Sequence, residues 1–132
     1  MRLTYRPREN ALRLALRPET RPAARRVEGA GILDLGEQGR LLGLEISAPP
    51  GLDLRQALHP WHERTGTPDW LSLGTGSAYL RLVPEPVAQA SRQARSVPVR
   101  LAMELDEQGT LLAVILPRRG EGYELSSPSG ST

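Results

Sequence analysis

Hydrophobic and polar residues alternate on both sides of a short, glycine-ended stretch in the first half of the chain. The run 32–35 alternates before the stretch 36–39, and the run 41–46 alternates after it. Alternation with a period of two is typical of a half-buried strand, and two such runs around a tight turn indicate a β-hairpin. We therefore predict a hairpin over residues 32–46, with Gly39 at a position of positive φ.

The same pattern returns later in the chain. Residues 101–116 repeat the order of strand, Glu-Gln-Gly turn and strand, and Gly109 takes the place of Gly39. Each hairpin is preceded by two further alternating runs, at 2–5 and 11–16 in the first half and at 70–73 and 78–83 in the second. A unit of this length that recurs within one chain indicates a duplicated structural element.

The longer connections inside the two units, residues 17–31 and 84–99, are predicted as loops that merge into the third strand of each unit. Their Ala, Gln and Arg content would also suit a helix. Pro98, between two valines, instead suits an extended strand at a sheet edge.

The segment between the units predicts one short helix. Asp53 and Gln56 have the spacing of a capping box, with Asp53 as the N-cap. Pro60 is expected to end the helix. Trp61 is the one large apolar residue of this segment, and we expect it to hold the linker against the sheet.

These elements predict a mainly β fold with a minor α component. It consists of two antiparallel β-meander repeats with pseudo-twofold symmetry, packed or joined edge to edge, and one short linker helix. We expect the first repeat at 1–46, the linker at 47–69, the second repeat at 70–125 and a disordered tail at 126–132. One such unit is too small to be stable alone with an exposed apolar face. The chain is therefore expected to be a monomer that contains an internal pseudo-dimer, or a homodimer.

The amino-acid composition excludes several classes of function. The chain has no Cys, which excludes disulfides, thiolate metal sites and a cysteine nucleophile. No apolar stretch follows the charges at the amino terminus, and no apolar run approaches the ~20 residues that cross a bilayer. We therefore expect a cytoplasmic protein with no membrane contact.

The two hairpins of the first half, spelled TYRPRENALRLAL and ILDLGEQGRLLGLEI, carry a recognisable set of motif residues. Asp34, Gly39, Gly43 and Glu45 match the pattern DxDxxGxxxGIEI, in which Gly36 replaces the second acid. With these residues, the first half resembles the YuzE-like small bacterial domain of unknown function. The resemblance implies no established activity, and the small size of such domains favours an interaction or regulatory role.

The second copy departs from this motif. Glu104 stands in place of Asp34, Ala113 in place of Gly43, and Ile115 in place of Glu45. A function carried by the glutamate of the exit strand would therefore be confined to the first half.

Three acids around the first hairpin, Asp34, Glu37 and Glu45, could form an acidic site for proton transfer or for a hard cation. Turn geometry and solvation already explain acids at such positions. An enzyme with this site is therefore a more remote alternative than a binding protein.

The only two histidines, His59 and His62, lie beside Glu63, and together they could bind Zn²⁺. Their spacing matches no familiar zinc motif, and Pro60 would break the helix that aligns them. We therefore predict no metal site and no cofactor. The chain also contains none of the common nucleophile, phosphate-loop or dinucleotide motifs, so we predict no catalytic residues.

All basic residues are Arg, and several gather in the long connections. Candidate contacts for a nucleic-acid backbone or an acidic protein are Arg17, Arg21, Arg25 and Arg26 in the first half and Arg92, Arg95 and Arg100 in the second. The formal net charge of +2 is small, so solvated loop charge explains them better than a binding surface does. The sequence thus predicts a non-catalytic protein-interaction or regulatory module, with a nucleic-acid-binding protein as the alternative.

Overall fold

The alternating runs form the strands that the pattern predicts. The computed structural model describes residues 2–16, 22–62, 70–83 and 95–126. The strands of the first half are β1 (Arg2–Arg6), β2 (Ala11–Ala15), β3 (Arg25–Leu35) and β4 (Leu41–Ser47). Those of the second half are β5 (Leu71–Leu73), β6 (Ser77–Arg81), β7 (Arg95–Leu105) and β8 (Leu111–Pro117), followed by β9 (Arg119–Gly120) and β10 (Tyr123–Glu124). The protein is mainly β and antiparallel, as predicted.

The two predicted tight turns are confirmed. The β3–β4 turn is a single 3₁₀ turn, η1 (Glu37–Gly39), and Gly39 has a φ of +75°. In the β7–β8 turn Gly109 has a φ of +82°. There Asp106 Oδ1 accepts hydrogen bonds from the N–H groups of Gln108 and Thr110, both at 2.9 Å. These side-chain bonds explain why an acid begins this turn.

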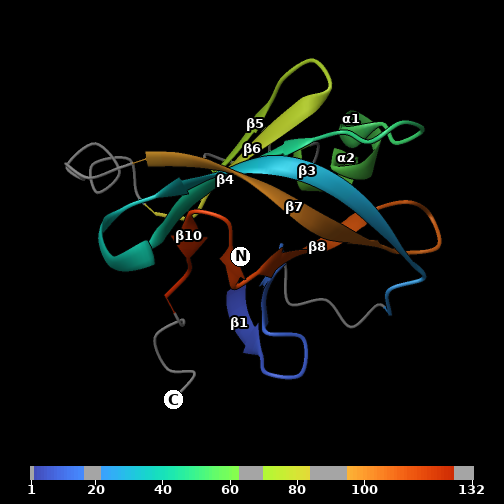
Figure 1. Cartoon of the computed structure of the whole chain (residues 1–132). Helices are drawn as coiled ribbons and strands as arrows, with labels where there is room; N and C mark the ends of the chain where they lie inside the picture. Colours follow the sequence, from blue (N-terminus) through green and yellow to red (C-terminus); the bar gives the residue numbers. More distant parts are fainter. Residues whose placement is uncertain (1, 17–21, 63–69, 84–94, 127–132) are drawn as a thin grey trace.

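Eight of these strands form one sheet in the order β1-β2-β8-β7-β3-β4-β6-β5. The halves therefore interleave, and neither forms the meander that we predicted from the sequence. β2 pairs with β8 and not with β3, and β4 pairs with β6. The long β3 and β7 lie side by side at the centre of the sheet (Figure 1).

If β1–β4 are exchanged with β5–β8, the strand order reads the same from the opposite edge of the sheet. In the β3–β7 ladder Ala30 pairs with Arg100, and Arg25–Leu105 mirrors Leu35–Arg95. The β3–β4 and β7–β8 ladders each shift register at the same place, after Asp34 and after Glu104. Within the eight-stranded sheet, β1–β4 and β5–β8 thus correspond in order and register, although the β7–β8 ladder is shorter than the β3–β4 ladder.

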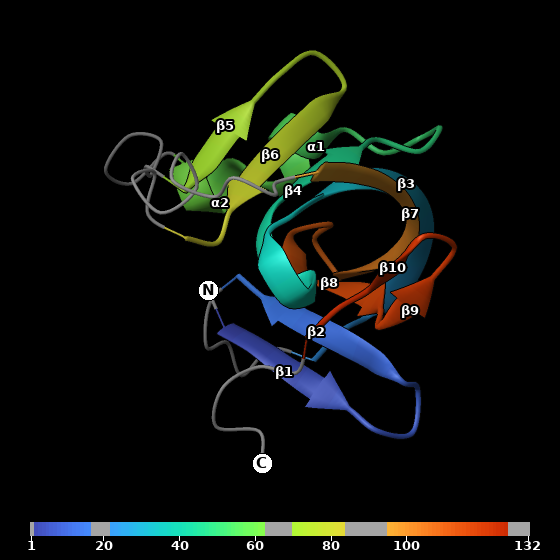
Figure 2. The ribbon, with the colours of Figure 1, turned by 60° about the vertical axis from the view of Figure 1, so that its left-hand side comes forward.

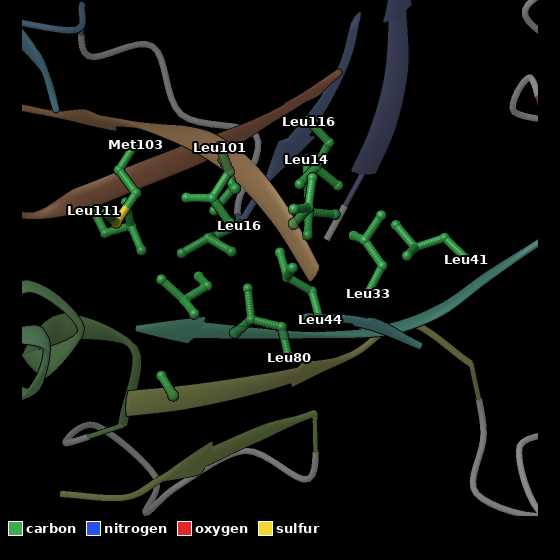
Figure 3. Close-up of a cluster of buried hydrophobic side chains, with 14 of the residues drawn as sticks. Leu14, Leu16, Leu33, Leu41, Leu44, Leu80, Leu101, Met103, Leu111 and Leu116 are labelled. Carbon is green, nitrogen blue, oxygen red and sulfur yellow. The ribbon is translucent and has the colours of Figure 1, made fainter. Parts of the chain in front are cut away.

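The sheet curls so that its inner face encloses the core (Figure 2). Alternate residues of the central strands point inward, and the paired Leu33 and Leu44 are both fully buried. Leucines from the two halves point toward one another in the core (Figure 3). At about 25 cal/mol per Å² of buried apolar surface, this core is the main favourable term of the fold.

The linker closes one part of the curl. α1 (Leu54–Ala57) is capped by Asp53, whose carboxylate accepts from the backbone N–H groups of Arg55 and Gln56. A second short helix, α2 (His59–His62), follows directly. Pro60 therefore does not end the helical segment as predicted. It lies in the first turn of α2, where its missing N–H has no helical partner to lose.

Trp61 holds this linker against the sheet, as predicted. Its side chain is buried, and its Nε1–H donates to the carbonyl of Leu111 at 2.9 Å. The segment after β8 makes a corresponding contact with the other half. Leu125 is buried, and the backbone N–H of Ser126 donates to the carbonyl of Gly39 at 3.0 Å. Of the tail predicted to be disordered, Ser126 thus belongs to the fold, and 127–132 lie outside the described residues.

Candidate interaction site at the open edge of β7

The first part of β7 is paired on one side only among the described strands. β7 pairs with β3 along its whole length, from Arg95 to Leu105. Its ladder with β8 covers only Ala102–Leu105. Beyond that point β8 stays paired with β2 alone, with Leu116 and Pro117 opposite Leu12 and Ala11. Residues 95–101 therefore form a strand edge that no described strand pairs with on the β8 side, although β7 lies at the centre of the sheet. This open edge is about 20 Å long at ~3.3 Å per residue.

The backbone groups at this edge can be assigned from the ladder. The carbonyl of Leu105 accepts from the N–H of Ala24 on the β3 side, and the N–H of Asp106 donates to Thr110 on the β8 side. Because successive residues of a strand aim their backbone groups to opposite sides, the even-numbered residues of β7 face the side that β8 leaves. Ser96, Pro98 and Arg100 therefore face the open edge.

This direction explains the proline within a strand. Pro98 lies opposite Ile32 in the β3–β7 ladder, and its ring nitrogen faces the open side. No ladder hydrogen bond to β3 is lost there, because Pro98 lacks its N–H on the side where no strand is paired. The sequence-based expectation that Pro98 suits an extended edge is confirmed. The connection before it, 84–94, lies outside the described residues.

A groove of about 520 Å³ lies along this edge. One wall is the stretch from Pro98 to Arg100, and the other is Pro117 with residues 119–121 of the β9–β10 hairpin. Tyr123 shapes the groove, because its hydroxyl donates to the carbonyl of Pro117 at 3.0 Å. The volume lies within the ~300–1,000 Å³ of small-ligand pockets, and one wall of the groove carries main-chain groups that no other described strand pairs with.

The described arginines of the two candidate clusters lie in separate places on the sheet. Arg25 pairs with Leu105 and Arg95 with Leu35, so these two arginines lie at opposite ends of the β3–β7 ribbon. Arg26 lies 3.7 Å from Glu9. Arg17, Arg21 and Arg92 lie outside the described residues.

Arg95 and Arg100 are the two candidate arginines at the open edge. Both side chains are exposed. Arg100 lies opposite Ala30 in the ladder, so its direct neighbour on β3 carries no charge. In the described part of the chain, the ion pairs engage other arginines, such as Arg13 and Arg119.

A polar cluster lies on the outer face of the first half, around the motif residue Asp34. Asp34 accepts hydrogen bonds from the Tyr79 hydroxyl at 2.7 Å and from the Ser96 hydroxyl at 2.8 Å. These bonds link β3 to β6 and β7. A Cβ at Gly43 would overlap the Tyr79 hydroxyl, so the glycine leaves the space that this tyrosine fills. Glu45 pairs with Tyr79 in the β4–β6 ladder and is half-buried.

Burial of Tyr79, its hydrogen bond to Asp34 and the charge of that carboxylate raise the pKa of Tyr79 well above its ordinary value. Tyr79 is therefore a neutral hydrogen-bond donor at physiological pH and not a base. At the equivalent ladder positions of the second hairpin, a charged pair replaces this cluster. There Glu104 accepts from Arg13 Nε at 2.8 Å, and Ile115 is buried with Ala11 and Ala102.

The predicted acidic site is only partly assembled. Asp34 and Glu45 lie on the same face, whereas Glu37 lies in the η1 turn and is exposed. Among the described residues, no three His, Cys, Asp or Glu side chains are grouped as a metal site would require. His59 is exposed at the start of α2, and the side chain of His62 lies outside the described residues.

Comparisons with known proteins give no relative. No protein-family model matches the chain, and neither a curated protein nor a solved structure matches it. No helix in the described part of the chain is long and apolar enough to cross a membrane.

The open edge and its groove were not evident from the sequence. Both depend on where the β7–β8 ladder ends, at Ala102, while β8 continues along β2 from the other half of the chain. Pro98 was the one local signal, because proline in a strand requires an unpaired side.

Proposed function

We propose that this protein is a non-catalytic interaction module that binds an extended segment of a partner protein at the open edge of β7. The segment would add a strand next to residues 95–101, where β8 no longer pairs with β7. In this mode main-chain hydrogen bonds supply affinity, and alternate side chains of the bound segment supply specificity.

One observation carries the proposal. The open edge and the groove coincide, so unpaired strand groups face a space that an extended chain can enter. Ser96 and Arg100 each offer an N–H and a carbonyl there, and Pro98 offers a carbonyl. An incoming strand therefore loses only the one bond that Pro98 cannot donate.

Nucleic-acid binding is supported less well by the arrangement of charge. Arg25 and Arg95 lie at opposite ends of the central ribbon, and a backbone-binding surface needs its cations side by side. A relationship of the first half to the YuzE-like domains also stays a proposal, supported by the roles of Asp34, Gly39 and Gly43.

Peptide selection tests the proposal. A library of random peptides displayed on phage is panned against the full-length protein, and enriched peptides are synthesised with a fluorescent label. We expect anisotropy titrations to show saturable binding. The backbone nitrogens of the peptide form two alternating sets, which we call the two phases. N-methylation of one phase should abolish binding and N-methylation of the other should leave it intact, because only every second N–H of an added strand faces β7.

Two variants of the protein provide matched controls. Arg100→Pro removes an edge N–H, as Pro98 already does two residues earlier, and should weaken binding about tenfold or more. Arg26→Pro introduces the same change on the part of β3 that is unpaired with β4 and should leave binding unchanged. Far-ultraviolet circular dichroism checks that both variants fold. Equal binding by the wild type and Arg100→Pro, or no dependence on the phase of N-methylation, would refute strand addition.

A further inference from the structure

The charges around the groove indicate which kind of segment fits the open edge. Arg95 and Arg100 lie on the edge strand, and Arg119 lies on the opposite wall of the groove. Glu121 is the one acid that lines the groove among the described residues. Arg119 lies 3.1 Å from Glu124, which leaves Arg100 as the groove-lining arginine without an ion pair among the described residues.

We infer that the occupant is an extended acidic segment of a partner protein, with a carboxylate side chain opposite Arg100. This inference rests on the proposed function. Directly opposed side chains on one face of a ladder interact, and opposite charges there favour the pair. On its β3 side Arg100 faces Ala30, so the position across the open edge is where a carboxylate meets it.

The neighbouring positions of the edge specify more of the segment. The side chains of Ser96, Pro98 and Arg100 lie on the same outer face, because side chains alternate along a strand. Ile32, which pairs with Pro98, is 39% exposed and is the one exposed large hydrophobic side chain among the described residues. An apolar residue opposite Pro98 would contact the apolar surface that these two residues form.

The direction of the bound segment follows from β8. A segment that continues the β8 ladder runs antiparallel to β7, so its residues meet Arg100 first, then Pro98 and then Ser96. The expected pattern is an acid, any residue, an apolar residue, any residue and a polar residue. A second copy of this chain that pairs through its own β7 is a poorer occupant, because it would bring its own Arg100 to the same edge.

Pro98 and the edge arginines also hinder the binding of unsuitable segments at this edge. Proline and charged residues on an exposed edge hinder pairing with apolar strands and so reduce aggregation. The edge therefore disfavours apolar segments and favours a segment whose charge neutralises the arginines.

A charge exchange tests the inference. The probes are the selected peptide from the panning experiment and the same peptide with its acidic residue opposite Arg100 replaced by Gln or by Lys. We expect the Gln peptide to bind the wild type more weakly by up to about fivefold, the upper end of the range for one cross-strand charge pair. Arg100→Glu should lose binding to the acidic peptide and gain binding to the Lys peptide. Arg25→Glu, at the far end of the ribbon, should change neither.

The outcomes separate this inference from the proposed function. Selected peptides without an enriched acid, and an Arg100→Glu variant that binds them as the wild type does, would overturn the acidic segment and leave strand addition intact. Arg100→Ala is the second control, because it removes the charge and keeps the edge N–H. If Arg100→Ala weakens binding as much as Arg100→Pro, charge alone holds the peptide, and strand addition is wrong. Tighter binding of labelled duplex DNA than of the acidic peptide, at equal salt, would overturn the acidic segment.

Discussion

Tyr79 shows how one residue depends on three strands. Its hydroxyl reaches Asp34 on β3, its ring occupies the space that Gly43 leaves on β4, and Asp34 is held in turn by Ser96 of β7. A single hydrogen bond of this kind contributes about 0.5–1.5 kcal/mol net. The motif residues Asp34 and Gly43 thus have a structural role in this fold, which explains them without chemistry at the acid.

We expect the stability of the protein to fall at alkaline pH through Tyr79. The pKa of this tyrosine is raised in the folded state above its ordinary value of 10.0, so the folded state favours the neutral form. Its contribution is complete below about pH 10 and is lost as the pH rises above that value. The free energy of unfolding, measured by urea denaturation at about pH 8 and about pH 11, should decrease less for Tyr79→Phe than for the wild type.

Asp34→Asn is the matching control for Tyr79, because it keeps an acceptor for the hydroxyl and removes the charge. Its alkaline loss of stability should lie between those of the wild type and Tyr79→Phe. The pKa of Tyr123 is also raised by burial, and this tyrosine contributes equally to all three proteins. An unchanged alkaline loss in Tyr79→Phe would show that another group is responsible.

Among the secondary-structure elements, each half contributes a segment that contacts the turn of the other half's hairpin. Trp61 of α2 bonds to Leu111 beside the β7–β8 turn, and Ser126 after β10 bonds to Gly39 in the β3–β4 turn. The sequence predicted the position of the helical segment, because the cap at Asp53 is a local signal. It did not predict the second helix, because Pro60 is compatible both with the end of one helix and with the first turn of another.

We expect Trp61 to contribute strongly to the attachment of this linker. Trp61→Ala removes a buried indole and should lower the free energy of unfolding by about 3–5 kcal/mol. Trp61→Phe keeps much of the apolar contact but leaves the Leu111 carbonyl without its donor, and should cost about 1–3 kcal/mol. Urea denaturation followed by circular dichroism measures both.

The matched control for Trp61 is Trp70→Phe. Trp70 is only partly buried and packs at the margin of the core, so its replacement should cost less than Trp61→Phe. Equal losses for the two tryptophans would contradict a specific role of Trp61.

Across the protein as a unit, the interleaved strand order makes each half dependent on the other. β2 has its second ladder partner in β8, and β4 has its second partner in β6. The central β3–β7 ladder, with eleven residues on each strand, also joins the halves. Neither half can bury its apolar face without the other.

We therefore expect the separated halves to fold only together. Fragments 1–62 and 70–132, which omit the undescribed residues 63–69 between them, should each lack cooperative unfolding. Their equimolar mixture should regain the circular dichroism and the cooperative urea transition of the intact chain. A fragment that unfolds cooperatively as a monomer, as judged by analytical ultracentrifugation, would contradict this view of the fold.

The local structure of this protein can be predicted from its amino-acid sequence. Period-two alternation located the strands, glycines at 39 and 109 located the tight turns, and Asp53 located the helical cap, because each of these signals acts over a few residues. The echo between the halves also indicated that equivalent elements would recur, and the strand order is unchanged when they are exchanged.

The choice of strand partners depends on contacts between distant parts of the chain. The β7–β8 ladder ends at Ala102 although β8 continues along β2, and the open edge and the groove lie where it ends. Hydrophobic alternation specifies which face of a strand is buried, but it does not specify which other strand pairs with it. The predicted arginines were therefore distributed by the sheet, and two of them, Arg95 and Arg100, came to lie at the edge that defines the candidate site.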